Sequence, residues 1–542
     1  MSKISRLCLA LLVTVGISIA FASRAGADEL TDAIKDLGSS DRDKVEQAVD
    51  RVARAPGAGP LSVLDALLEG TLRLDAQGVP FIAGEGGAIK PALEGGPDQP
   101  TPPTTTLEVD NRLRRQLEPK IASLRLSFPD RKVRLQAAEG LAKRRNDDLA
   151  PLVRQVLERE QDAGVRKMLE LALAQTDLYG NDRVKRLAAL GAIERAAAAD
   201  FKPSIERMLE KDSSGAFKET DEDIRRAAQA ALGAIEVRAM WVGMLGNLFY
   251  GVSLGSVLLL AALGLAITFG LMRVINMAHG ELLMIGAYAT FTVQQLFLKH
   301  LPGAADWYLV AAVPVAFVVC MLLGMALERT VIRFLYGRPL ETLLATWGIS
   351  LVLIQTVRLI YGAQNVTVAN PKYLAGGFEL FPGFVLTYSR LAVIAFSSAV
   401  IGFVWLILQK TALGLHVRAV TQNREVAAAM GIPTRSVDLW TFGVGSGVAG
   451  LGGVALSQLG NVGPELGQQY IVDSFMVVVL GGVGKLAGTL AGALGLGVIN
   501  KLLEPAAGAV LGKIVVLIFI ILFIQRRPQG IFALKGRAAE VM

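Results

Sequence analysis

Apolar residues follow two different patterns along this chain. Before Trp241 they recur every three or four positions between charged residues, which is the period of amphipathic helices. From Trp241 onward they form long continuous runs separated by short polar stretches, which is typical of helices that span a membrane. The pattern predicts an all-α protein in which an α-helical domain precedes a polytopic membrane helix bundle.

The continuous runs predict the membrane spans and their direction. Basic residues occur at Arg273 and cluster at 329–338, at 410–435 and from Arg526 onward. Such positions mark cytoplasmic loops. An odd number of spans takes the chain from an external start to a cytoplasmic end, and nine spans meet this condition. With eight spans, one of the loop assignments would have to be wrong. The run at 471–484 is short, so a re-entrant or tilted segment stays open there. The nine runs cover about 242–271, 276–298, 307–327, 341–361, 388–409, 436–459, 471–484, 486–503 and 511–525.

The N-terminus has the three parts of a secretory signal peptide. A basic start precedes an apolar run at 7–21, and Ala25-Gly26-Ala27 fits the A-x-A cleavage site. The run is short for a membrane span, which favours a cleaved signal peptide at 1–27 over an uncleaved anchor helix. Residues 28–238 are therefore expected outside the cytoplasm.

The amphipathic region contains a repeated motif. An acidic residue is followed by a valine or isoleucine, a basic residue and alanines at helical spacing, and such helix pairs recur roughly every 30–40 residues. This recurrence predicts an α-solenoid of the HEAT kind that serves as a scaffold or docking surface. Clustered glycine and proline at 77–110 predict a long loop or a small irregular insertion. The motif occurs at 130–142, 163–174, 182–198 and 221–235.

Composition and charge narrow the class of protein. The chain is 52% hydrophobic and 19% charged, with a mean hydropathy of +0.45, which excludes an ordinary soluble protein and a disordered one. Residues 241–542 hold 19 lysines and arginines against 11 acidic residues, and residues 1–240 hold 36 against 37. Because the basic excess lies in short clusters between apolar runs, it argues against a nucleic acid partner.

The sequence gives no reason to expect catalysis. The two cysteines, Cys8 and Cys320, lie in apolar runs and leave the exported region without a disulfide. The segment GGVGKL at 481–486 is not a Walker A loop, because Leu486 stands where a Ser or Thr must hold Mg²⁺. We therefore expect no enzyme activity, no ATP hydrolysis by the chain itself, no cofactor and no metal site.

Polar residues interrupt the apolar pattern at the start of one predicted span. The segment RVINMAHGELLMIGAY (273–288) places Asn276, His279, Gly280 and Glu281 there, with the first three on one helical face at i, i+3 and i+4. Polar groups at membrane depth are costly unless they face a cavity or a partner, so these four residues are candidates for a translocation path. A structural polar cluster or a helix cap near the cytoplasmic interface is the alternative.

A second candidate is the loop at 410–436, which joins two predicted spans. Asn423 can cap a short helix with Glu425 in its first turn, and Gly431 and Pro433 can end that helix. An isolated helix of this length is marginal in water, so it needs a partner, and a groove on a cytosolic subunit would supply one. Its small apolar face is expected to consist of Val426, Ala427 and Met430.

Glycines late in the membrane region are spaced for helix packing. The runs GVGSGVAGLGG (443–453) and GGVGKLAGTLAGALGLG (481–497) hold glycines four residues apart, which lets helix backbones approach closely in lipid. Packing within the chain is favoured over a dimer interface. The helix-packing candidates are Gly443, Gly447, Gly484, Gly488 and Gly492.

Several segments resemble the LivH-type permeases of branched-chain amino acid ABC importers. The resemblance covers essentially all of 241–537 and implies a transmembrane permease domain of 8–9 helices at 239–537. The segments are GLAITFGLMRVINMAHGELLMIGAY (264–288), TALGLHVRAVTQNREVAAAMGI (411–432), FMVVVLGGVGKLAGTLAGALG (475–495) and RPQGIF (527–532). The resemblance also implies that the 410–436 loop couples to an ATPase through Gly414, Arg418, Ala419, Asn423, Glu425, Ala427, Met430 and Gly431.

The exported extension departs from a plain amino acid permease. A signal peptide and a helical domain ahead of a LivH-type core resemble the UrtB-type permease subunits of urea ABC importers. This resemblance implies a bacterial inner-membrane protein with its N-terminal domain in the periplasm and its C-terminus in the cytoplasm. The implied partners are a second LivM-type permease, two cytosolic ABC ATPases and a periplasmic substrate-binding protein.

The substrate and the mode of transport stay open at this point. The membrane half has no acidic pair suited to a proton relay, so a neutral substrate fits, and branched-chain amino acids or another small neutral amide fit as well as urea. A stand-alone channel or secondary carrier is an alternative of another class, but it gives no reason for the capped loop at 410–436. A membrane-anchored scaffold, in which the exported helical domain is the active part, is a third alternative.

Overall fold

The structure is a computed structural model in two compact units, Met1–Ala239 and Met240–Met542, which are described separately. The predicted signal peptide at 1–27 lies outside the described residues. The described residues are 30–39, 41–55, 59–84, 89–93, 104–107, 109–213, 215–272 and 274–532.

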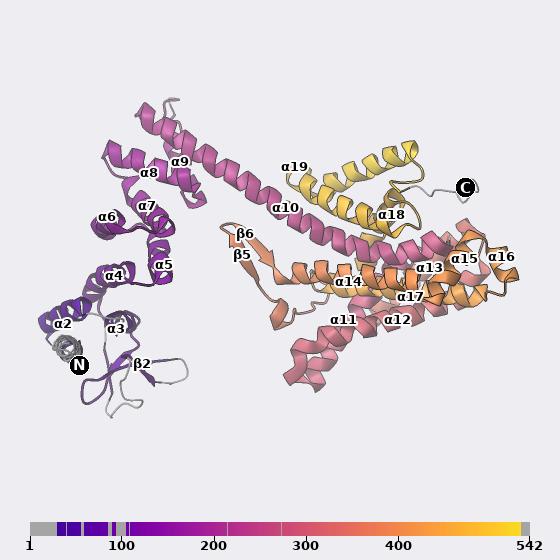
Figure 1. Cartoon of the computed structure of the whole chain (residues 1–542), viewed down its shortest axis with the longest axis horizontal. Helices are drawn as coiled ribbons and strands as arrows, with labels where there is room; N and C mark the ends of the chain where they lie inside the picture. Colours follow the sequence, from indigo (N-terminus) through magenta and orange to yellow (C-terminus); the bar gives the residue numbers. More distant parts are fainter. Residues whose placement is uncertain are drawn as a thin grey trace, which may run out of the picture. The chain divides into compact units, whose positions relative to one another are not determined.

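The first unit begins with helices and a small sheet around one hydrophobic core (Figure 1). Four short strands form an antiparallel sheet in the order β3-β2-β1-β4. The 77–110 segment is therefore not only a loop, because it carries three of these strands. Strands this short contain too few alternations to be read from the sequence. The elements are α2 (Arg42–Arg54), α3 (Gly59–Leu68), β1 (Leu72–Leu74), β2 (Pro80–Ala83), β3 (Ile89–Pro91), β4 (Thr105–Thr106) and α4 (Asn111–Leu126).

The rest of the first unit is helical, as the repeated motif predicts. The aspartate that opens a motif accepts hydrogen bonds from backbone N–H groups in the first turn of the helix that follows, which satisfies donors that have no partner within the helix. These capping residues are Asp130, Asp162, Asp182 and Asp221. The helices are α5 (Arg131–Ala142), α6 (Ala150–Arg159), α7 (Ala163–Asp177), α8 (Arg183–Ala196), α9 (Lys202–Leu209) and the start of α10 (Glu222–Met272).

Ion pairs connect one motif with the next in the same way at two places. Arg131 donates to the capping carboxylate of Asp162 at 2.7 Å, and Arg183 donates to that of Asp221 at 2.7 Å. The arginine four residues after the cap also binds carbonyls just before its own helix, as Arg225 does with Glu219 and Thr220. The repeated sequence thus encodes repeated contacts, and its HEAT-like character stays a prediction.

Acidification is expected to weaken these connections. Hydrogen bonds from Arg131 and Arg183 lower the pKa values of Asp162 and Asp221. A carboxyl whose pKa is lowered by folding stabilises the fold above its unfolded pKa, and this contribution is lost as the pH falls through the folded value. The melting temperature of fragment 28–239, followed by circular dichroism, should therefore decrease as the pH is lowered below the ordinary pKa of aspartate. The Arg131→Ala/Arg183→Ala variant should show a weaker dependence, and an identical dependence would contradict the assignment.

The second unit is a helix bundle with one hairpin of strands. Its fold confirms the prediction of an all-α, polytopic protein. The hairpin joins β5 (Gly377–Phe381) to β6 (Phe384–Thr387) ahead of α14. The helices after α10 are α11 (His279–His300), α12 (Tyr308–Thr330), α13 (Pro339–Tyr361), α14 (Tyr388–Lys410), α15 (Ala412–Gln422), α16 (Arg424–Ala429), α17 (Thr434–Ser457), α18 (Leu466–Gly481) and α19 (Leu486–Arg526).

Six helices of the described residues are long and apolar enough to cross a membrane: α10, α12, α13, α14, α17 and α19. The predicted spans at 276–298 and 471–484 correspond to α11 and α18, which are not among the six. Helix α19 covers both of the last predicted runs and is bent between them (Figure 1). The bend lies at Gly508, where φ is 75°. The number of crossings stays a prediction.

The membrane helices differ in which surface they bury. The apolar parts of α10 and α17 are mostly buried, whereas those of α12, α13, α14 and α19 are mostly exposed. Large apolar side chains such as Leu322, Val352, Trp405 and Phe519 lie on this outer surface. An exposed apolar surface of this extent requires a non-aqueous environment or a partner. Helices α10 and α17 therefore lie at the centre of the bundle.

Four of the five predicted packing glycines lie at helix contacts within the chain. Gly443 and Gly447 face side chains of α12, and Gly488 and Gly492 face the backbone of α18. Gly484 was predicted to lie on a helix face, but it does not. It lies in the turn before α19 at a φ of 82°, where a side chain would be strained, and it packs against α10.

Helix α17 also contacts α11 through backbone atoms, and this contact is expected to tolerate no side chain. A Cβ at Gly453 would overlap the carbonyl oxygen of Leu283 and lie 2.6 Å from the amide nitrogen of Ala287. Gly453→Ala should therefore cost about 3 kcal/mol of stability. Gly402→Ala in α14 is the matched control, because its Cβ would meet nothing within 4 Å. Size-exclusion chromatography in detergent after heating would compare them, and equal loss of the folded peak would contradict this packing.

Candidate functional site

The four candidate residues of the 273–288 segment are all buried, at the start of α11 or just before it. The helix begins at His279, and Asn276 lies in the preceding turn, where its side-chain oxygen accepts from the Ala278 amide at 3.0 Å. The prediction that Asn276 shares a helical face with His279 and Gly280 is therefore wrong. The asparagine side chain competes with the helix for backbone groups, which places it outside the regular turn.

The structure brings two of the four residues together and turns a third away. Glu281 accepts a hydrogen bond from the Ser350 hydroxyl of α13 at 2.5 Å. A Cβ at Gly467, just inside α18, would lie 2.5 Å from the second carboxyl oxygen of Glu281. Gly280 packs against the same glycine, whose carbonyl oxygen would lie 2.5 Å from an added Cβ. Gly280 and Glu281 therefore meet α13 and α18 at one junction.

His279 faces the other side of the helix. Its Nε2 lies 2.9 Å from the carbonyl oxygen of Ala261 in α10. A Cβ at Gly264, one turn further along α10, would lie 2.7 Å from the imidazole ring. The histidine therefore fixes α11 against α10, which favours a structural role for this member of the motif.

Helix α13 carries a row of buried hydroxyls that includes Ser350. Thr342, Thr346 and Ser350 follow one another at i, i+4 and i+8 and are all buried, although most of this helix is exposed. The Thr346 hydroxyl accepts from the Met277 amide at 3.1 Å, and Ser350 donates to Glu281. Sequence reasoning missed these residues. The signal was a polar stripe of helical period inside an apolar run.

Among the residues that the structure describes, three buried polar atoms of the motif find no hydrogen-bond partner: Asn276 Nδ2, His279 Nδ1 and Glu281 Oε2. An unpaired buried polar group costs about 1–3 kcal/mol. Such atoms are candidates for contacts with a transported molecule or with water. Of the three, Glu281 Oε2 lies at the junction of α11, α13 and α18.

The loop at 410–436 folds as two short helices, and its predicted cap is confirmed. The side chain of Asn423 accepts from the Val426 amide at 3.0 Å at the start of α16. The helix ends before Gly431, whose φ is 84° and therefore favours glycine. Glu425 lies in the first turn, where its charge favours the positive end of the helix.

The prediction that Val426, Ala427 and Met430 form one apolar face of this helix is wrong. Ala427 is 4% exposed and packs within the chain, whereas Val426 and Met430 are 56% and 78% exposed. Positions i and i+4 share a face of a helix, and position i+1 points about 100° away. Val426 and Met430 are therefore the large apolar side chains on the exposed surface of α16.

The preceding helix, α15, is held firmly to the bundle. A Cβ at Gly414 would overlap the backbone of Leu408, so glycine is required there. Arg418 donates to the Leu408 carbonyl, and Ala419 is half-buried nearby in the chain. Thr421 donates to the carbonyl of Leu271 at the end of α10, at 3.1 Å. The loop is therefore attached to both α14 and α10.

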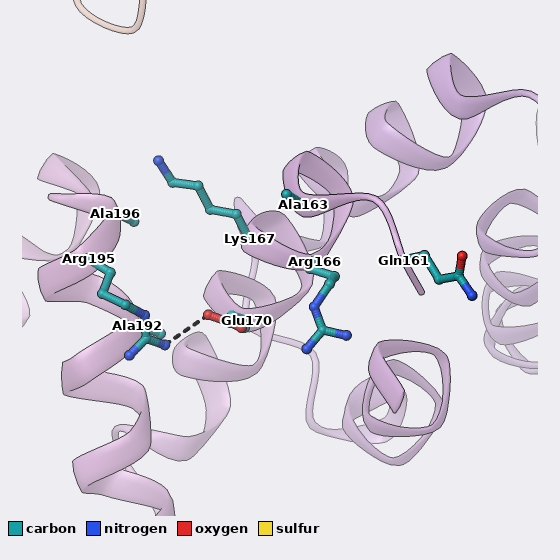
Figure 2. A pocket seen from close by; sticks show the side chains of 8 residues that line it. All are labelled: Gln161, Ala163, Arg166, Lys167, Glu170, Ala192, Arg195 and Ala196. Atoms are coloured by element: carbon teal, nitrogen blue, oxygen red, sulfur yellow. Dashed lines mark hydrogen bonds and ion pairs between the residues drawn. The ribbon is translucent and has the colours of Figure 1, made fainter. Parts of the chain in front are cut away.

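The first unit has a surface pocket of about 300 Å³ between α7 and α8 (Figure 2). Its arginines already have partners, because Arg195 pairs with Glu170 at 3.0 Å and Arg166 donates to two backbone carbonyls. These contacts support helix packing, and the pocket carries no functional assignment. It is lined by Gln161, Ala163, Arg166, Lys167, Glu170, Ala192, Arg195 and Ala196.

A polytopic bundle with an apolar outer surface and a buried polar junction is compatible with a membrane transport component. Residues 247–524 match the family described as branched-chain amino acid transport system / permease component, and the chain belongs to this family. The family match lies within the second unit, so the first unit lies outside it.

Curated relatives agree with the family. The chain is 30% identical over 293 residues to the high-affinity branched-chain amino acid transport system permease protein LivH of Escherichia coli K12, which covers 53% of this chain and 94% of the relative. It is 28% identical to the corresponding protein BraD of Pseudomonas aeruginosa, over 53% and 95% of the two chains. The probable LivH of Methanocaldococcus jannaschii is 29% identical, over 51% and 88%. The protein is therefore a permease component and not an enzyme.

Proposed function

We propose that this chain is the translocating permease subunit of an ATP-driven ABC importer for urea. It would form the translocation path together with a second LivM-type permease. Two cytosolic ABC ATPases would supply the energy, and a periplasmic binding protein would deliver the substrate. The single observation that carries the substrate proposal is the chemistry of the buried polar groups.

The buried polar groups of the second unit suit a small neutral amide. Among the described residues of that unit they are hydroxyls, amides, carboxyls and one imidazole, with no buried lysine or arginine. Urea has N–H groups that can donate to a carboxyl oxygen such as Glu281 Oε2, and one carbonyl that can accept from a hydroxyl or an amide. The α-carboxylate of an amino acid would instead require a cationic side chain or several N–H donors.

Branched-chain amino acids are the second candidate substrate, because the relatives named above are amino acid permeases. Uptake of labelled urea and labelled leucine by cells with and without this chain distinguishes the two. Loss of urea uptake alone supports the proposal. Loss of leucine uptake alone would overturn the substrate assignment.

The proposed orientation places the first unit in the periplasm and the loop at 410–436 in the cytoplasm of a bacterium, with the C-terminus also inside. The basic residues of the loop favour this side. The first unit, a HEAT-like repeat domain in this proposal, would serve as a docking surface for the binding protein or for assembly. Its helices offer a broad side-chain surface and no catalytic arrangement was identified among its described residues.

The exposed surface of α16 is the proposed contact with an ATPase. Val426 and Met430 are exposed on a helix that begins at the Asn423 cap and buries Ala427 within the chain itself. A stand-alone channel or carrier would gain nothing from such a surface. If the purified chain moved urea into liposomes without any ATPase, the channel or carrier would replace the importer.

A further inference from the structure

The first residue of α16 is fixed to α17 by a two-point ion pair. Arg424 donates from Nη1 to one carboxyl oxygen of Asp438 at 3.1 Å, and from Nη2 to the other. The Asp438 side chain is only 3% exposed, and that of Arg424 is 45% exposed. A planar guanidinium bound at two points fixes the direction as well as the distance of its partner. Helix α16 therefore cannot turn or shift freely relative to α17.

The same guanidinium connects α16 to α12. Its central carbon lies 5.1 Å from the ring centre of Tyr336, which follows α12 in the chain. The Tyr336 hydroxyl donates to Glu328 of α12 at 3.3 Å, and Glu328 is itself buried. Tyr336 also packs against the small apolar cluster that includes Phe442 of α17. One cation thus connects a short surface helix to two long helices.

Helix α17 reaches the polar junction through its backbone contacts with α11. A Cβ at Gly286 of α11 would lie 2.6 Å from the Cα of Gly450 in α17. Contacts this close allow little independent movement of the two helices. A displacement of α17 is therefore passed to the helix that carries Glu281.

We propose that Arg424 and Asp438, with Tyr336 and Glu328, form a link that converts movement of α16 into movement of α17 and α12. This inference rests on the proposed function of the 410–436 loop. Arg424 and Asp438 are positioning residues in it. The guanidinium is turned toward its own chain, whereas the docking surface of α16 is formed by Val426 and Met430.

The reconstituted importer tests the link by the number of ATP molecules hydrolysed for each urea taken up. In Arg424→Ala and Asp438→Asn the ATPases should stay bound while this ratio rises at least ten-fold. Arg424→Lys keeps the charge and loses the two-point geometry, so its ratio should be intermediate. Arg526→Ala is the control, because Arg526 is exposed in the last turn of α19, outside the 410–436 loop, and should leave the ratio unchanged.

Two results would overturn the link. One is an unchanged ratio in Arg424→Ala, and the other is loss of the ATPases from that variant, which would make Arg424 a docking residue. Asp438 is buried, so Asp438→Asn can fail to assemble. In that case the Arg424 variants, at a partly exposed position, test the link. The wild-type importer is measured first, so a failure of ATP-driven urea uptake itself counts against the proposed function and is distinguishable from a failure of the link.

Discussion

Met430→Asp is expected to release the proposed ATPase subunits from the transporter. Met430 is 78% exposed and shares a helix face with Val426, so the substitution should not disturb the fold of the chain. A carboxylate placed in the centre of an apolar contact is desolvated without a partner, and a change of this kind costs about 2 kcal/mol or more in binding. Co-purification of tagged ATPases with the membrane subunit measures the effect, and ATP-driven uptake should be lost with it.

Leu380→Asp is the control for this substitution. Leu380 is 57% exposed in strand β5. Its segment, 362–387, holds one basic residue, Lys372, and is therefore expected on the external side of the membrane. The same change of character there should leave the ATPases bound. Retention of the ATPases by Met430→Asp, or equal loss from both variants, would rule out α16 as the docking surface.

Glu281→Ala is expected to lower uptake at least ten-fold while leaving the ATPases bound. The substitution removes the acceptor of the Ser350 hydroxyl and the free carboxyl oxygen at the junction of α11, α13 and α18. An unpaired buried hydroxyl costs about 1–3 kcal/mol, and loss of a substrate contact adds to this. Initial rates of labelled urea uptake in proteoliposomes measure the effect. Glu281→Gln keeps an acceptor for Ser350 and should retain more activity.

Glu341→Ala provides the matched control for the carboxyl at the junction. Glu341 pairs with Arg338 at the exposed start of α13, and both side chains are more than half exposed. Exposed pairs of this kind contribute little, so uptake should be close to that of the wild type. Wild-type uptake in Glu281→Ala would show that the junction does not belong to the translocation path.

Features that depend on local sequence were predictable. The apolar runs predict the long helices because spanning a bilayer requires about 20 consecutive apolar residues. The Asn423 cap of α16 was predicted because its side chain can satisfy nearby backbone donors. The acidic start of the repeated motif was also visible in the sequence, and the structure shows that its aspartates are caps. The same logic gave Gly431 as the end of that helix, where the observed φ of 84° favours glycine.

Features that depend on tertiary contacts were not predictable. Helical spacing alone placed Asn276 beside His279, but the asparagine caps a turn outside the helix. Ala427 was expected on the docking face, yet its small side chain fits against the bundle while Met430 projects outward. Ser350 belongs to a polar stripe of helical period in α13, but the stripe alone does not show what it faces, and only the long-range contact with Glu281 reveals this.

Uptake by the purified complete importer in proteoliposomes tests the central claim most directly. Vesicles would contain this chain, the second permease and the two ATPases, with the binding protein outside and ATP inside. Labelled urea is predicted to accumulate above its external concentration, to require ATP and to be unaffected by an excess of leucine. Accumulation of leucine without urea, or entry of urea that only equalises the two concentrations and needs no ATP, would contradict the account.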